Sequence, residues 1–168
     1  DNERTTPLMA ASEMGSIPTA KLLIERGADV NAVSDVGFTP LIVATSQGHF
    51  ELAKLLVESG AEVDGDHQDG VTALMYAAAN HRGDILEYLI SKGANVNAQH
   101  ANGGTALLEA AAAGNASIVA ALLARGANPH LLDNDAMSPL MTAAAQGHTE
   151  VCRLLLAQGV DVNKMSNS

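Results

Sequence analysis

Residues 38–64 read FTPLIVATSQGHFELAKLLVESGAEVD, and the pattern of this stretch decides the fold. Two short apolar runs are separated by Gly48, and the second run ends at Gly60. Thr39 followed by Pro40 is typical of a helix start, because the hydroxyl can accept a hydrogen bond from a free backbone N–H while proline has no N–H to leave unpaired. Glycine after each run favours the left-handed conformation that ends a helix. The stretch therefore predicts a helix, a tight turn and a second helix.

The same pattern recurs at an interval of 33 residues along the chain. The helix-starting hydroxyl residues are Thr6, Thr39, Thr72, Thr105 and Ser138, and the helix-ending glycines are Gly27, Gly60, Gly93, Gly126 and Gly159. The residues between units are rich in Asn, Asp and Gly, which predicts turns and a projecting loop or hairpin. A fixed period of this length is typical of a solenoid, whose stacked units bury one another's apolar faces. We expect one domain over residues 1–168 with five units, at about 1–33, 34–66, 67–99, 100–132 and 133–165.

The composition argues against several classes of protein. Asp and Glu number 19 against 9 Lys and Arg, so the net charge is −10 and no nucleic-acid partner is expected, because phosphate binding needs a basic surface. The single cysteine, Cys152, can form neither an internal disulfide nor a cysteine-rich zinc site. No run of 18 apolar residues and no signal-peptide pattern is present. We expect a cytoplasmic or nuclear protein without membrane insertion.

Residues 38–64 and the stretch SPLMTAAAQGHTEVCRLLLAQGVDVN, residues 138–163, resemble the ankyrin repeat. That 33-residue unit carries T-P-L-H-x-A-A near its start, followed by G-H, L-L and G-A-D-V-N, and the resemblance covers all five units. It implies an all-α solenoid of stacked helix-turn-helix units with projecting hairpin loops. It also implies that Asn31 and Asn163 are similar to sites of asparagine hydroxylation, although a purely turn-stabilising role is the favoured alternative.

Three features depart from the family pattern. The usual His after T-P-L is replaced in every unit, by Met9, Ile42, Met75, Leu108 and Met141, and we expect an apolar contact there. His81 and Arg82 replace Gly-His in the third unit. Pro129 and His130 replace Val-Asn in the fourth. We expect altered turns at both places.

The sequence predicts no catalytic residues, no cofactor and no metal. His67, His100 and Asp133 recur at the 33-residue interval and could form a row of ligands. However, packed helices stand about 8–10 Å apart, whereas zinc ligands lie about 2.0–2.3 Å from the ion. We therefore expect these to be solvated loop residues. His49 and His148 are expected to be turn residues that help to begin the second helix, and Cys152 to be a small packed side chain.

Without reactive chemistry, the function is expected to lie on a surface. In the ankyrin family one face of the first helix lines a concave groove and the loop tips border it. Carried onto this chain, the resemblance gives candidate partner-binding residues in the groove at Ser46, Gln47, Tyr76, Asn80 and Glu109, and at the loop tips at Asp35, Val36, Phe38, Asp69, Val71, Asn102 and Met137. Phe38, Val71, Tyr76 and Met137 are the expected anchors, because exposed apolar and aromatic groups often mark interfaces. The alternative for Phe38 and Val71 is packing against a neighbouring loop.

These features favour a non-enzymatic protein–protein interaction module that binds a peptide or a protein surface. The alternative is a regulatory or substrate-recruiting segment of a larger enzyme, channel or ubiquitin-ligase component. Acidic residues gather between Asp64 and Asp69, so we expect a partner with basic residues. The first and last units carry as many apolar residues as the middle ones, and we expect flanking repeats or a self-contact to cover them.

Overall fold

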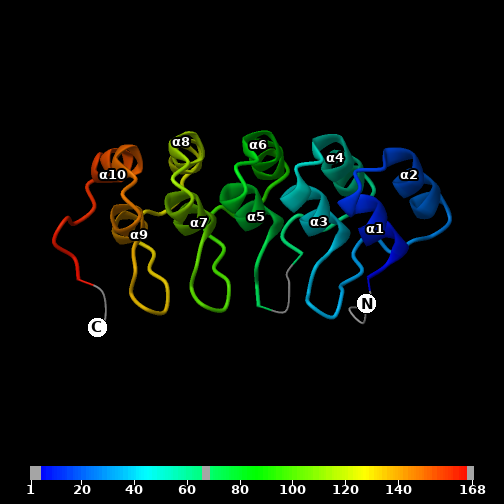
Figure 1. The fold of residues 1–168 in the computed structure, drawn as a ribbon, viewed down its shortest axis with the longest axis horizontal. Helices are drawn as coiled ribbons and strands as arrows, with labels where there is room; N and C mark the ends of the chain where they lie inside the picture. The colour runs from blue at the N-terminus through cyan, green and yellow to red at the C-terminus, as the bar shows by residue number, and fades with distance from the viewer. Residues whose placement is uncertain (1–4, 66–68, 166–168) are drawn as a thin grey trace.

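The structure is a computed structural model that describes residues 5–65 and 69–165. Ten helices and no strands occur in this part of the chain: α1 (Pro7–Glu13), α2 (Ile17–Glu25), α3 (Pro40–Gln47), α4 (Phe50–Glu58), α5 (Ala73–Ala79), α6 (Gly83–Ser91), α7 (Ala106–Ala112), α8 (Ala116–Ala124), α9 (Pro139–Ala145) and α10 (Thr149–Leu156). Consecutive helices pair, and the pairs stand side by side in one row (Figure 1). The odd-numbered helices form one layer, the even-numbered helices form a second, and the loops project away from both (Figure 1). The expected all-α solenoid is confirmed.

Each odd-numbered helix begins as the sequence predicts. Thr6, Thr39, Thr72, Thr105 and Ser138 have extended backbones, and each side chain accepts a hydrogen bond from the backbone N–H three residues later. Met9 and Met75, which replace the family His, place their sulfur atoms 3.5 Å from the backbone nitrogens of Thr6 and Thr72. The contact at these two positions is therefore not purely apolar as expected, because the polarizable sulfur accepts a weak hydrogen bond.

The turns at His81 and at Pro129-His130 are regular, which corrects our expectation. His81 adopts a left-handed backbone with φ of 59°, the conformation that Gly48 has at the equivalent place with φ of 82°. The Asn115 amide lies 2.8 Å from His81 Nδ1 and holds the ring in place. In the fourth unit the His130 N–H donates to Asn128 Oδ1 at 2.9 Å, which closes the turn with a side-chain acceptor.

The core explains why the chain contains 30 alanines. One alanine of each odd-numbered helix is buried at the same position, namely Ala11, Ala44, Ala77, Ala110 and Ala143. Its small side chain allows neighbouring helices to approach closely. Both layers supply larger buried side chains, among them Leu8, Leu41, Leu74 and Leu107 of the odd-numbered helices and Leu52, Leu56, Leu86, Leu89 and Leu122 of the even-numbered helices.

Side chains at the start of the even-numbered helices link one unit to the unit before it. His49 Nε2 lies 3.0 Å from the Glu13 carbonyl oxygen, and His148 Nε2 lies 3.0 Å from the Ala112 carbonyl oxygen. Arg82 replaces the histidine in the third unit and donates to the Ser46 carbonyl at 3.3 Å. His49 and His148 do stand at helix starts, but their side chains make no capping bond. Their polar contacts therefore join units.

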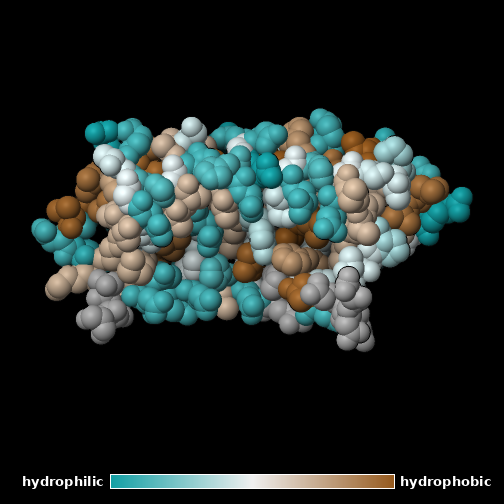
Figure 2. Space-filling view, in the orientation of Figure 1, coloured by the Kyte–Doolittle hydropathy of each residue, from teal (hydrophilic) through white to brown (hydrophobic). Residues whose placement is uncertain are grey.

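The two ends of the row expose apolar side chains. Leu22 on α2 is 50% exposed and Leu156 on α10 is 43% exposed, whereas the equivalent residues of the inner units are at least partly buried. Apolar surface is visible at both ends in Figure 2.

Candidate binding groove

Three hollows lie along the side of the row where the odd-numbered helices meet the projecting loops. We call this surface the groove. The first hollow has a volume of about 280 Å³ and is lined by Thr5, Met9, Glu13, Ser34, Val36, Phe38, Val43, Ser46 and Gln47. The second, about 180 Å³, is lined by Val71, Met75, Tyr76, Ala79, His100 and Glu109. The third, about 150 Å³, is lined by His100, Asn102, Gly104, Leu108, Glu109, Ala112, Asp133 and Thr142.

The loops that border the groove are hydrogen-bonded hairpins. The Ser34 N–H donates to the Phe38 carbonyl at 3.0 Å, and the Phe38 N–H donates back to Ser34 Oγ at 3.0 Å. The hairpin in the last unit closes in the same way, between Asp133 and Met137, at 3.1 Å for the backbone bond and 2.8 Å for the bond to Asp133 Oδ1. These bonds fix the backbone that presents the loop-tip side chains.

Neighbouring hairpins are also joined to one another. The Ala101 N–H donates to the Asp69 carbonyl at 2.6 Å, and the Asn134 N–H donates to the Asn102 carbonyl at 2.9 Å. The Asn134 amide adds a bond to the Ala101 carbonyl at 3.0 Å. The loop tips of the third, fourth and fifth units are therefore held at a fixed spacing.

Phe38 and Tyr76 pack against each other edge to face. Their ring centroids are 5.7 Å apart with an interplanar angle of 62°, an arrangement that aromatic pairs prefer. Both side chains are half-buried. Burial raises the pKa of the Tyr76 phenol, and the nearby Glu109 carboxylate raises it further. Phe38 thus packs against a side chain of helix α5 rather than against the neighbouring loop of our alternative, and it also lines the first hollow.

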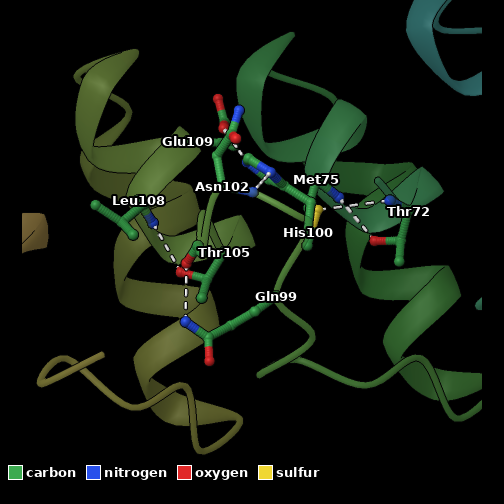
Figure 3. A network of polar contacts seen from close by, with 9 residues as sticks. Thr72, Met75, Gln99, His100, Asn102, Thr105, Leu108 and Glu109 are labelled. Atoms are coloured by element: carbon green, nitrogen blue, oxygen red, sulfur yellow. Dashed lines mark hydrogen bonds and ion pairs between the residues drawn. The ribbon is translucent and has the colours of Figure 1, made fainter. Parts of the chain in front are cut away.

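His100 turns its ring into the groove beside Glu109 (Figure 3). Its Nδ1 accepts the Asn102 N–H at 3.1 Å, and its Nε2 lies 3.9 Å from Glu109 Oε1. Gly104 makes room for this ring, because a Cβ at that residue would lie 2.1 Å from His100 Nε2. Burial raises the pKa of the Glu109 carboxyl group, and the coulombic effect of His100 acts in the opposite direction.

Eight of the twelve predicted site residues line the hollows: Val36, Phe38, Ser46, Gln47, Val71, Tyr76, Asn102 and Glu109. The other four, Asp35, Asp69, Asn80 and Met137, line none of these three. The Asn80 amide donates to the Tyr76 carbonyl at 2.9 Å instead.

His100 was missed, since the sequence predicted a solvated loop residue and its side chain is only 16% exposed. The sequence feature that could have revealed the buried His100 is Gly104, because the equivalent residues of the other units are the larger Phe38, Val71 and Met137. His67, another member of the expected row of three, lies outside the described residues.

The described residues contain no group of three or more His, Cys, Asp and Glu side chains that could hold a metal ion. Cys152 is partly buried and forms no disulfide. None of the helices in residues 5–65 and 69–165 combines the length and apolar character needed to cross a bilayer.

The family described as "Ankyrin repeats (3 copies)" matches residues 8–100 and, in a second overlapping match, residues 74–166. Together the two matches cover nearly the whole chain, so the protein belongs to the ankyrin-repeat family. Ankyrin repeats are in general protein–protein interaction modules. A search of the curated proteins found no match.

Proposed function

We propose that this protein is a non-enzymatic interaction module that holds an extended peptide segment, or an equivalent edge of a protein surface, in the groove. The observation that carries the proposal is the row of three hollows, each lined by side chains from hairpins and odd-numbered helices together. Concave sites lined by apolar walls and a few polar groups are where ligands bind.

The spacing of the units suits an extended chain. Neighbouring helices pack about 8–10 Å apart, and an extended strand advances about 3.3 Å per residue. One unit of the groove therefore accommodates roughly three residues of a bound segment. The second and third hollows share His100 and Glu109, so they would take side chains close together in the segment.

The hydrogen-bonded hairpins supply the mechanism of binding. Bonds such as Asn134 N–H to Asn102 O, at 2.9 Å, hold the loop tips before any partner arrives. The protein then loses little conformational entropy on binding, and the smaller entropic cost increases the affinity.

A second candidate function is favoured by the exposed ends. Leu22 and Leu156 lie on the outer faces of the terminal units, where a free-standing solenoid normally carries polar residues. A regulatory or substrate-recruiting segment of a larger enzyme, channel or ubiquitin-ligase component would place further structure against these faces. The groove would serve the same purpose in that setting.

The test compares two alanines that are both exposed. Ala112 lines the third hollow, whereas Ala120 lies on α8 outside the groove. Peptides are selected from a displayed random library on the wild-type protein, and their affinities are measured by calorimetry. We expect Ala112→Arg to weaken binding at least about tenfold, roughly 1.4 kcal/mol, and Ala120→Arg to leave it unchanged. Equal effects of the two substitutions would show that the groove is not the binding surface.

A further inference from the structure

We propose that the second hollow is a subsite for one positively charged side chain, an arginine or lysine of the bound segment. This inference rests on the proposed function, because it assumes that a partner segment occupies the groove. We call the hollow the cation subsite; it is formed by Val71, Met75, Tyr76, Ala79, His100 and Glu109.

The cation subsite combines one carboxylate, one aromatic ring and an apolar wall. Val71, Met75 and Ala79 supply apolar surface for the methylene groups of a long side chain. Glu109 and Tyr76 supply the groups that attract its charged end. A volume of about 180 Å³ admits a side chain but no element of secondary structure.

The Glu109 carboxylate is poorly satisfied by the protein itself. Its side chain is only 37% exposed, and the described part of the chain offers it no hydrogen-bond donor. The His100 Nε2 atom is 3.9 Å away, which is beyond hydrogen-bonding distance. A half-buried carboxylate without a donor is costly, and a guanidinium or ammonium group from a partner would remove that cost.

His100 makes no hydrogen bond to this carboxylate. Its Nδ1 accepts the Asn102 N–H at 3.1 Å, and its Nε2 stays 3.9 Å from Glu109 Oε1. The imidazole therefore forms a wall of the hollow, packed over Gly104. The negative charge of Glu109 stays available to a ligand.

Tyr76 adds a second attraction for a cation. A cation within about 6 Å of an aromatic ring is attracted by the ring quadrupole. The edge-to-face contact with Phe38 fixes the orientation of the Tyr76 ring before the ligand arrives. The net charge of −10 favours the approach of a basic segment over a long range.

Two carboxylates line the groove from the odd-numbered helices, and they lie in different hollows: Glu13 of α1 in the first, and Glu109 of α7 in the second and third. At the positions equivalent to Glu109 the other units carry Ala10, Val43, Tyr76 and Thr142. The half-buried Glu109 beside Tyr76 occurs in the second hollow, whereas Glu13 is exposed, so the subsite favours the alignment that brings the basic side chain to Glu109.

The experiment uses two peptides that differ in one side chain, which is charged in the probe and neutral in the control. The probe is acetyl-Ala-Ala-Arg-Ala-Ala-amide, and the control replaces arginine by citrulline, its neutral isostere. Both are titrated into the ¹⁵N-labelled full chain and followed by amide chemical shifts. We expect saturable shifts at Tyr76, His100 and Glu109 with the arginine peptide, and binding at least about tenfold weaker with the citrulline peptide.

Two variants assign the effect to the carboxylate. Glu109→Gln should abolish the preference for arginine over citrulline, whereas Glu51→Gln, an exposed carboxylate on α4 outside the groove, should preserve it. Thermal melting of both variants shows that each remains folded. Glu109→Gln removes a half-buried charge, so its melting temperature should not fall below that of the wild type.

Three results would overturn the inference: equal binding of the two peptides, shifts confined to the first hollow, or an arginine preference that survives Glu109→Gln. None of these would by itself overturn the proposed function. If library peptides lose affinity with Ala112→Arg but carry no preference for a basic residue, the groove binds partners and the cation subsite is wrong. If Ala112→Arg has no effect, the proposed function fails first.

Discussion

The Asn31 side chain offers a direct test of how one unit is held to the next. Its amide nitrogen donates to the Gly60 carbonyl at 3.1 Å, and its Oδ1 accepts the Glu62 N–H at 2.8 Å. Asn31→Ala removes both bonds while it keeps the backbone. At about 0.5–1.5 kcal/mol for each bond, the free energy of unfolding should fall by about 1–3 kcal/mol. For a chain of this size that corresponds to a melting temperature lower by roughly 2–12 °C.

Asn163 is the matched control, because it holds the equivalent position in the last unit. Its backbone N–H donates to Asp161 Oδ1 at 2.9 Å, and this bond does not need the asparagine side chain. Within the described residues that side chain has no partner, so Asn163→Ala should change stability by less than about 0.5 kcal/mol. Urea unfolding followed by circular dichroism measures both variants. Hydrogen exchange should also show α1 and α2 opening sooner in Asn31→Ala. Equal destabilisation by the two substitutions would refute the role assigned to the side-chain amide.

Three further predictions follow from the same structure. Ala136 has a left-handed backbone with φ of 57°, so Ala136→Gly should stabilise the protein by about 0.5–1 kcal/mol in urea unfolding; a loss of stability would contradict this. Leu89 is fully buried and Leu156 is 43% exposed, so Leu89→Ala should cost about 2–5 kcal/mol and Leu156→Ala about 1 kcal/mol or less. Burial raises the pKa of the Glu109 carboxyl group above 4.5, so the folded state binds its proton more tightly than the unfolded state does. Its contribution to stability is then present at acid pH and is lost as the pH rises through the raised pKa. The free energy of unfolding, measured at a series of pH values across this range, should show that loss in the wild type and not in Glu109→Gln.

The fold could be predicted because its determinants are local and repeated. Thr39 and Pro40 begin a helix wherever their equivalents occur, and the 33-residue interval forces the units into one row. His81 shows where local reasoning failed. A left-handed histidine costs roughly 1–2 kcal/mol, and the Asn115 amide contact offsets part of that cost. The regularly stacked units on either side therefore impose the regular turn at His81.

The groove could be predicted as a surface, but its contacts could not. Phe38 and Tyr76 lie in different units, and only the stacking of those units brings their rings within 5.7 Å. His100 has no local signature of burial. Its position depends on the absence of a side chain at Gly104. Pairwise contacts between units are therefore the part of the site that periodicity leaves undetermined.

Glu109 brings stability and binding into opposition, and this distinguishes a ligand-binding carboxylate from a structural one. A structural carboxylate would receive hydrogen bonds from the protein, and its removal would lower both stability and affinity. Glu109 is half-buried, lies 3.9 Å from His100 Nε2 without a hydrogen bond to it, and has a pKa that burial raises, so its ionised form is destabilising in the free protein. Replacement by glutamine should then preserve or raise the melting temperature while it removes the preference for a cation. Opposite signs in these two measurements are expected only if the charge is kept for a partner.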